Sequence, residues 1–131
     1  MTSEQKERIL VVDDEEPVRA LMAAMLRDEY DVDAAADAEE ALERCREYEY
    51  PAVIVDIALP GRLNGFELVA EMRKVLPNAK VIMITGLALD NENMRRGTAV
   101  ADGLLKKPFD VEEIKAMLRK DLKLEHLPHG G

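Results

Sequence analysis

The stretch ILVVDD, residues 9 to 14, joins a short apolar run to two consecutive acids. A run of four residues rich in Val and Ile predicts a strand that is buried on both faces of a sheet. Other stretches also predict strands, the last two of them more weakly: AVIV at 52–55, VIMI at 81–84, GLL at 103–105 and DVDAA at 31–35. The chain therefore carries strand signals for a five-stranded sheet.

Segments with helical spacing lie between these strands. The clearest one places five apolar side chains on one helical face: Val18, Leu21, Met22, Met25 and Leu26. Three helix starts pair a capping side chain with an acid three residues later: Asp37 with Glu40, Asn64 with Glu67, and Asp110 with Glu113. We expect helices at 16–28, 37–49, 65–75, 89–100 and 110–121. This alternation predicts an α/β fold, with helices covering both faces of a parallel sheet.

The composition limits what kind of protein this can be. The 131 residues have room for one compact domain. The net charge of -9 repels phosphate backbones and anionic membranes, so we expect neither direct nucleic-acid binding nor membrane contact. The polar start MTSEQKER does not resemble a signal peptide, which favours a cytoplasmic location. The single cysteine, Cys45, has a helical position beside small apolar residues, and we expect it in the core.

The end of the chain loses the helical pattern and contains Pro and Gly. We therefore divide the chain into a domain at 1–124 and a flexible tail or linker stub at 125–131. Both histidines, His126 and His129, lie in this tail. We expect them to be solvated, because the tail lacks the partners that a metal site needs.

Four of the five strand signals are followed by polar residues that could carry chemistry. These are Asp13 and Asp14, Asp56, Thr85, and Lys106 with Lys107. In open parallel sheets, binding sites form beyond the carboxyl ends of the strands. Three carboxylates, a hydroxyl and an ammonium should therefore meet at one edge of the sheet. Each residue alone would be ordinary, since Asp and Thr are common at strand ends and in turns, but the combination is not.

A cluster of three carboxylates needs a compensating charge. Two carboxylates about 4 Å apart repel each other by about 4 kcal/mol at an effective dielectric constant of 20. A divalent cation removes this repulsion, and oxygen ligands with several waters suit Mg²⁺. Such a site also fits an aspartate that attacks phosphorus, because the cation and a lysine would absorb charge on the phosphoryl oxygens.

Over residues 8 to 122 the sequence resembles the receiver domains of two-component response regulators, of the stand-alone, chemotaxis-regulator-like kind. The resemblance is carried by five short motifs: VVDD at 11–14, VDIALPG at 55–61, NGFEL at 64–68, ITG at 84–86 and KPF at 107–109. It implies a flavodoxin-like doubly wound fold with strand order 2-1-3-4-5 and five flanking helices. It also implies a cis peptide bond between Lys107 and Pro108.

The resemblance implies a role for each acid at the edge of the sheet. Asp56 would accept the phosphoryl group. Asp14 would ligate Mg²⁺ directly and Asp13 would assist through water, while Asp56 and the backbone carbonyl of Ala58 would complete the protein ligands. The domain would promote its own phosphorylation and slow dephosphorylation, without being an enzyme for an external substrate.

The remaining motif positions imply how the phosphoryl group is held and sensed. Thr85 would hydrogen-bond one phosphoryl oxygen, and Lys107, which directly precedes the proline, would pair with another. Thr85 and Leu104 would form the switch, although Leu104 stands where many receivers carry Tyr or Phe. Ala58 and Leu87 would flank the phosphoryl group, and neither can orient a water molecule, so we expect slow loss of phosphate.

The partners implied by the resemblance are a sensor histidine kinase or a histidine phosphotransfer protein as donor, and a downstream effector protein. Homodimer formation on phosphorylation stays open. One alternative is a receiver-like docking module that works without phosphorylation. A hydrolase of the haloacid dehalogenase type would need a second Asp where Ala58 stands, and a flavin-binding protein would need a phosphate loop after the first strand.

Overall fold

The five strands form one parallel sheet in the order β2-β1-β3-β4-β5. The computed structural model describes residues 6–86, 95 and 99–126. Within these, the strands are β1 (Glu7–Val12), β2 (Tyr30–Ala35), β3 (Ala52–Asp56), β4 (Lys80–Thr85) and β5 (Gly103–Lys106). The helices are α1 (Glu16–Leu26), α2 (Ala38–Glu47), α3 (Gly65–Val75) and α5 (Val111–His126). Both the α/β class and the strand order are as predicted.

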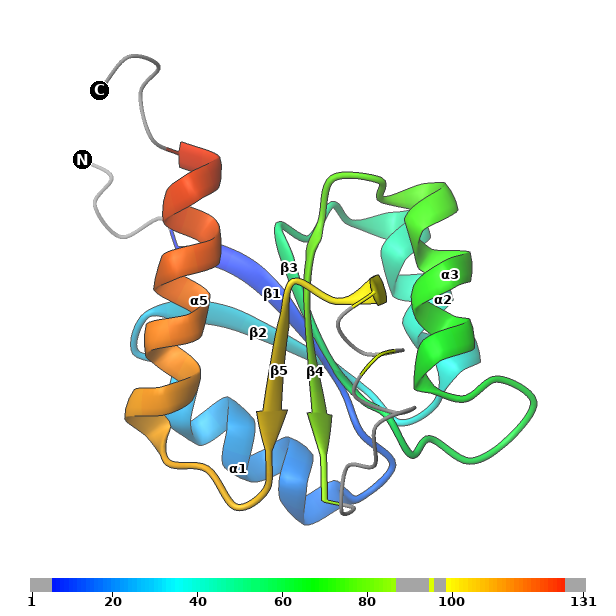
Figure 1. Ribbon diagram of the computed structural model, residues 1–131, viewed down its shortest axis with the longest axis horizontal. Helices are drawn as coiled ribbons and strands as arrows, with labels where there is room; N and C mark the ends of the chain where they lie inside the picture. The colour runs from blue at the N-terminus through cyan, green and yellow to red at the C-terminus, as the bar shows by residue number, and fades with distance from the viewer. Residues whose placement is uncertain (1–5, 87–94, 96–98, 127–131) are drawn as a thin grey trace.

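Two apolar cores lie on opposite faces of the sheet. α1 and α5 cover one face, while α2 and α3 cover the other (Figure 1). Successive residues of β1 alternate between them, so that Leu10 faces the α2 and α3 core and Ile9 faces the α1 and α5 core. This explains why the strands read as continuous apolar runs, since every side chain of an inner strand is covered.

Local capping signals determine where the helices begin. Asn64 and Glu67 cap each other reciprocally at the start of α3, where each side chain accepts the other residue's backbone N–H at 2.9 Å. The same pattern joins Asp110 and Glu113 before α5. At α2, Asp37 caps the backbone as expected, but the Glu40 side chain accepts from an earlier residue instead. The predicted starts of these helices are therefore confirmed.

The far ends of the helices were harder to predict. α1 ends at Leu26 instead of residue 28, and the carboxylate of Asp28 pairs with Lys115 of α5 at 2.9 Å. α5 continues to His126, five residues beyond the expected end and into the segment assigned to the tail, because the first helix breaker there is Pro128. The fourth expected helix, 89–100, lies largely outside the described residues.

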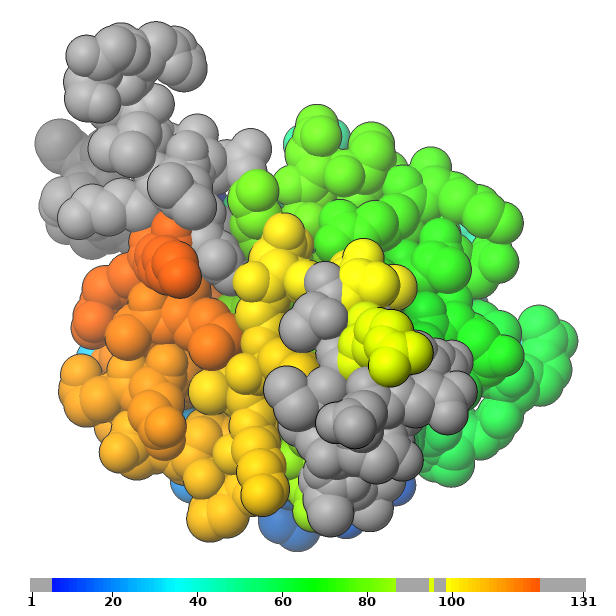
Figure 2. All heavy atoms as spheres, viewed as in Figure 1, coloured from blue at the N-terminus to red at the C-terminus, as the bar shows by residue number. Residues whose placement is uncertain are grey.

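The face shown in Figure 2 places α5 on one side of β5 and α3 on the other. Gly103 lies under α5 here, and a β-carbon at this position would lie 2.5 Å from the sulfur of Met117 unless that side chain moved. Cys45 is buried, as expected. No helix in the described part of the chain is long and apolar enough to cross a membrane.

Candidate functional site

The carboxyl ends of β1 and β3 bring three acids together at one edge of the sheet. Asp13 and Asp14 directly follow β1, and Asp56 is the last residue of β3. One carboxylate oxygen from each lies within 4.8 Å of the others. The convergence of these acids, predicted from the strand ends, is present in the structure.

Asp13 is fixed through each of its polar groups. Its backbone N–H donates to the carbonyl of Ala35 on β2 at 3.1 Å, and its Oδ1 accepts the N–H of Glu15 at 2.9 Å. Its own carbonyl accepts a hydrogen bond of 2.8 Å from the guanidinium of Arg19 in α1. Only 2% of the residue is exposed. Asp14, by contrast, is exposed to solvent.

Asp56 is also held firmly, with an exposed fraction of 7%. Its Oδ1 accepts the backbone N–H of Ala58 at 2.9 Å, which sets the rotation of the carboxylate. The backbone behind it packs against the first residue of α3, where Gly65 donates to the carbonyl of Ile57 at 3.0 Å. Asp56 therefore presents its second oxygen from a rigid position.

Lys107 supplies the positive charge of the site. Its Nζ lies 3.4 Å from Oδ2 of Asp56 and 3.5 Å from Oδ2 of Asp13. Its backbone N–H donates to the carbonyl of Thr85 at 2.7 Å, and the expected cis bond to Pro108 is present. The neighbouring Lys106 is exposed, so the structure brings Lys107 rather than Lys106 to the acids.

Burial and the neighbouring charges shift the pKa values of Asp13 and Lys107. Burial raises the pKa of Asp13 to about 6, and the charge of Asp56 adds to this rise, while the N–H of Glu15 and the charge of Lys107 oppose it. Burial would lower the pKa of Lys107, but the charges of Asp56 and Asp13 outweigh burial and raise it. Among the described residues, Lys107 is the one cation that pairs with acids of this cluster. The all-oxygen donor set with one solvent-facing acid fits Mg²⁺.

The other predicted site residues lie near this edge or outside the described residues. Thr85 ends β4 and is buried, while Ala58 is exposed directly after β3. Leu104 is half-buried on β5 and packs against the core formed with α2 and α3. Leu87 falls outside the described residues.

Three residues that support the site were not predicted as site residues from the sequence. Arg19 lies in a helix that is predicted from its apolar face, and nothing nearby marks its contact with Asp13. Glu15 donates its backbone N–H to Asp13, a contact that any residue type except proline could make. Gly65 belongs to one of the five motifs, but its close packing against Asp56 is visible only in three dimensions.

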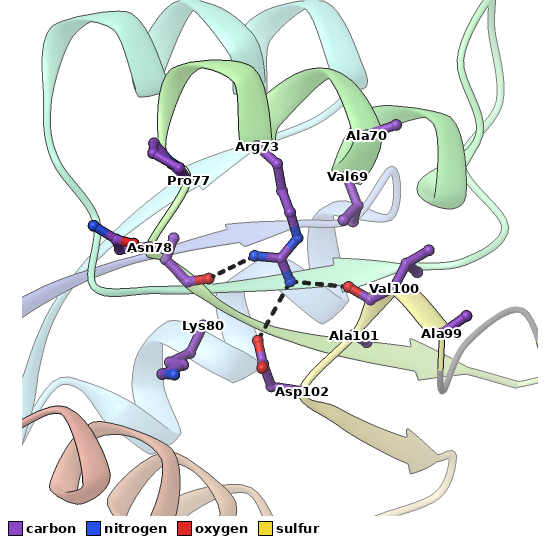
Figure 3. Close-up of a pocket in the computed structure, with 11 residues that line it drawn as sticks. Val69, Ala70, Arg73, Pro77, Asn78, Lys80, Ala99, Val100, Ala101 and Asp102 are labelled. Carbon is purple, nitrogen blue, oxygen red and sulfur yellow. Dashed lines mark hydrogen bonds and ion pairs between the residues drawn. The ribbon is translucent and has the colours of Figure 1, made fainter.

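A pocket of about 650 Å³ lies at the opposite end of the sheet (Figure 3). Arg73 spans it, donating to the carbonyls of Ala79 and Val100 at 3.1 and 2.9 Å and pairing with Asp102 at 3.4 Å. These contacts join α3 to the segment that leads into β5. None of the predicted site residues that the structure describes lines this pocket.

Comparison with known proteins gives one consistent result. The family model of the response regulator receiver domain matches residues 9–119. The transcriptional regulatory protein TcrA of Mycobacterium tuberculosis is 37% identical over 113 residues, which cover 86% of this chain and 44% of TcrA. The chemotaxis protein CheY of Halobacterium salinarum is 34% identical, covering 78% of this chain and 85% of that protein.

A solved structure agrees with the sequence relatives. The chemotaxis protein CheY4 of Vibrio cholerae superposes with a TM-score of 0.81 and 31% identity, covering 88% of this chain and 98% of that one. The chain spans about half the length of the first curated relatives that it matches. With its fold and its family match in agreement, this chain belongs to the response regulator receiver domains of two-component systems.

Proposed function

We propose that this receiver domain accepts a phosphoryl group on Asp56, with Mg²⁺ bound by the acids at the same edge of the sheet, and that phosphorylation changes which protein it binds. The observation that carries the proposal is the pairing of a buried, hydrogen-bonded Asp56 with Lys107 at 3.4 Å beside two further acids. The domain would act on itself and turn over no external substrate.

Each residue of the site has its own role in the phosphoryl transfer. A carboxylate oxygen of Asp56 forms a bond to phosphorus as the bond from phosphorus to the donor's imidazole nitrogen breaks, and the nitrogen keeps that electron pair. The N–H of Ala58 holds the carboxylate in place during attack. Lys107 stabilises charge on the phosphoryl oxygens, and we assign the Thr85 hydroxyl to another of these oxygens.

Asp13, Asp14 and Asp56 would hold the cation, with the carbonyl of Ala58 as a further ligand. Bound there, Mg²⁺ supplies positive charge to the phosphoryl oxygens. Asp13 is positioned by three of its own hydrogen bonds and needs little rearrangement. The oxygen-only chemistry of this donor set supports magnesium over zinc.

The surface of α1 supports a protein as the phosphodonor. Its solvent face carries Ala20, Leu21 and Ala24, and Leu21 is 58% exposed. This apolar face lies on the helix that begins two residues after Asp14, so a partner that buried it would bring a phosphohistidine close to Asp56. We therefore propose a sensor histidine kinase or a histidine phosphotransfer protein as donor, and a separate effector as the downstream partner.

Intact mass spectrometry tests the proposal directly. The protein is incubated with acetyl phosphate and Mg²⁺, and we expect the mass gain of one phosphoryl group, lost in Asp56→Asn and retained in the control Asp31→Asn, an exposed acid on β2. Release of free phosphate over many cycles would point to a hydrolase instead. An unmodified Asp56 with every donor tried would favour a docking module that works without phosphorylation.

A further inference from the structure

We infer that Arg19 is a positioning residue for the metal site, and that its guanidinium holds the peptide between Asp13 and Asp14 in the orientation that cation binding requires. This inference rests on the proposed function, because it concerns the same acids. It adds a residue from α1 to a site otherwise built from the ends of the strands.

The contact is short and specific. An Nη1 of Arg19 donates to the carbonyl oxygen of Asp13 at 2.8 Å, and the arginine is half-buried in the first turns of α1. The backbone N–H of Arg19 is in turn bound to the carbonyl of Glu15 at 3.1 Å. The guanidinium is therefore anchored on α1, the helix that begins directly after the acidic loop, residues 13–15.

This contact matters most for Asp14. The carbonyl of Asp13 and the N–H of Asp14 belong to one planar peptide unit, so a hydrogen bond to that carbonyl restrains the direction in which Asp14 leaves the backbone. The carboxylate of Asp14 makes no hydrogen bond or ion pair with another described residue, whereas Asp13 and Asp56 are each held by a backbone N–H. Asp14 therefore depends on its backbone for its position.

The positive charge of Arg19 has the opposite effect on Mg²⁺ affinity from its positioning role. A guanidinium beside the acids repels an incoming cation, so a purely electrostatic role predicts that removal of Arg19 tightens Mg²⁺ binding. A positioning role predicts weaker binding, because partners that orient metal ligands typically contribute about 10 to 100-fold in affinity. The sign of the change separates the two roles.

The test is a titration of the full chain with Mg²⁺. Calorimetry measures the affinity, and backbone amide chemical shifts monitor the same titration. We expect Arg19→Met to weaken Mg²⁺ binding by about tenfold or more. Arg19→Lys keeps the charge and one donor and should restore part of the affinity. The control is Arg27→Met at the exposed C-terminal end of α1, which removes the same charge far from the acids and should leave the affinity within about twofold of wild type.

Equal or tighter binding by Arg19→Met would overturn the inference, as would an equal loss in Arg27→Met. Thermal unfolding without metal shows whether each variant is folded. If Arg19→Met is not folded, the test rests on Arg19→Lys, which should be folded and bind Mg²⁺ more weakly than wild type. Failure of the wild-type protein to bind Mg²⁺ would instead remove the proposed function itself. The two failures are therefore distinguishable.

Discussion

The backbone of Gly65 packs directly against Asp56, so closely that a β-carbon on Gly65 would lie 2.5 Å from the carbonyl oxygen of Asp56. The contact joins the first residue of α3 to the last residue of β3, and the obstructing atoms are backbone, which cannot rotate away. It fixes α3 behind the proposed phosphoacceptor and closes the loop that connects them.

Gly65→Ala should therefore destabilise the protein. The added methyl group forces the start of α3 away from β3, which we expect to cost about 1–3 kcal/mol in the free energy of unfolding. Urea denaturation followed by circular dichroism measures the change. Gly86→Ala is the control, since among the described residues its β-carbon would meet the Lys107 side chain at an ordinary 3.5 Å. Equal stability of Gly65→Ala and wild type would show that the contact relaxes easily.

Asp56→Asn should stabilise the metal-free protein. The substitution removes one charge from a buried cluster in which Asp13 and Asp56 share a single ammonium, and we expect a gain of about 1 kcal/mol or more. Urea denaturation in the presence of a chelator measures it, with Asp31→Asn as the control. Mg²⁺ at about 100 times the Kd of the wild type should add about 2.7 kcal/mol to the unfolding free energy of the wild type. The same concentration should add less to Asp56→Asn. A less stable Asp56→Asn would contradict this account.

Ala58→Asn should speed the loss of phosphate from Asp56. Ala58 is exposed directly after the phosphoacceptor strand and has no group that can orient a water molecule. A side-chain amide there could do so, and we expect roughly a tenfold faster decay, less than the effect of one full oxyanion-hole donor. Loss of the phosphorylated mass over time measures the rate. Ala70→Asn, on the exposed face of α3, should decay like wild type, and an unchanged rate in Ala58→Asn would rule out this explanation.

Cys45 should report unfolding by its reactivity. The side chain is 2% exposed, and burial raises the pKa of its thiol to about 11. At pH 8 we expect the native thiol to react with a disulfide reagent at least about a hundredfold more slowly than in urea, because the thiolate is the reactive form. Rapid labelling of the native protein would show that α2 opens readily.

The same raised pKa predicts how stability depends on pH. A thiol that is neutral in the folded state contributes stability that is fully present below its ordinary pKa of 9.0. This contribution is lost as the pH rises through about 11, because the unfolded thiol ionises first. Urea midpoints of wild type and Cys45→Ala should therefore converge between these two values. Parallel curves would contradict the assignment.

The proposed site was largely predictable because its main residues end strands. A polar residue that follows a buried strand lies at the edge of the sheet, and parallel strands all end at the same edge. The strand ends alone therefore predict that Asp13, Asp14 and Asp56 meet, and one carboxylate oxygen from each lies within 4.8 Å of the others. Helix starts were predictable for a similar reason, since the Asn64 and Glu67 pair acts over three residues.

Helix ends and supporting contacts were not predictable in this way. α1 ends two residues early beside the pair between Asp28 and Lys115, which are 87 residues apart in the chain. The hydrogen bond from Arg19 to Asp13 spans only six residues, but it depends on the angle at which α1 leaves the sheet. That angle follows from packing.

By itself, the sequence determined the alternation of buried strands and capped helices, and the polar residue type at each strand end. These follow from hydrophobic periodicity and local hydrogen bonding, which act between residues that are close in the chain. Only the tertiary structure decided that Lys107 meets an acid 51 residues away, that Gly65 packs on Asp56, and that Arg19 holds the acidic loop. Such contacts depend on how whole elements pack, because distances of a few ångströms between distant residues are set by the shapes of both cores.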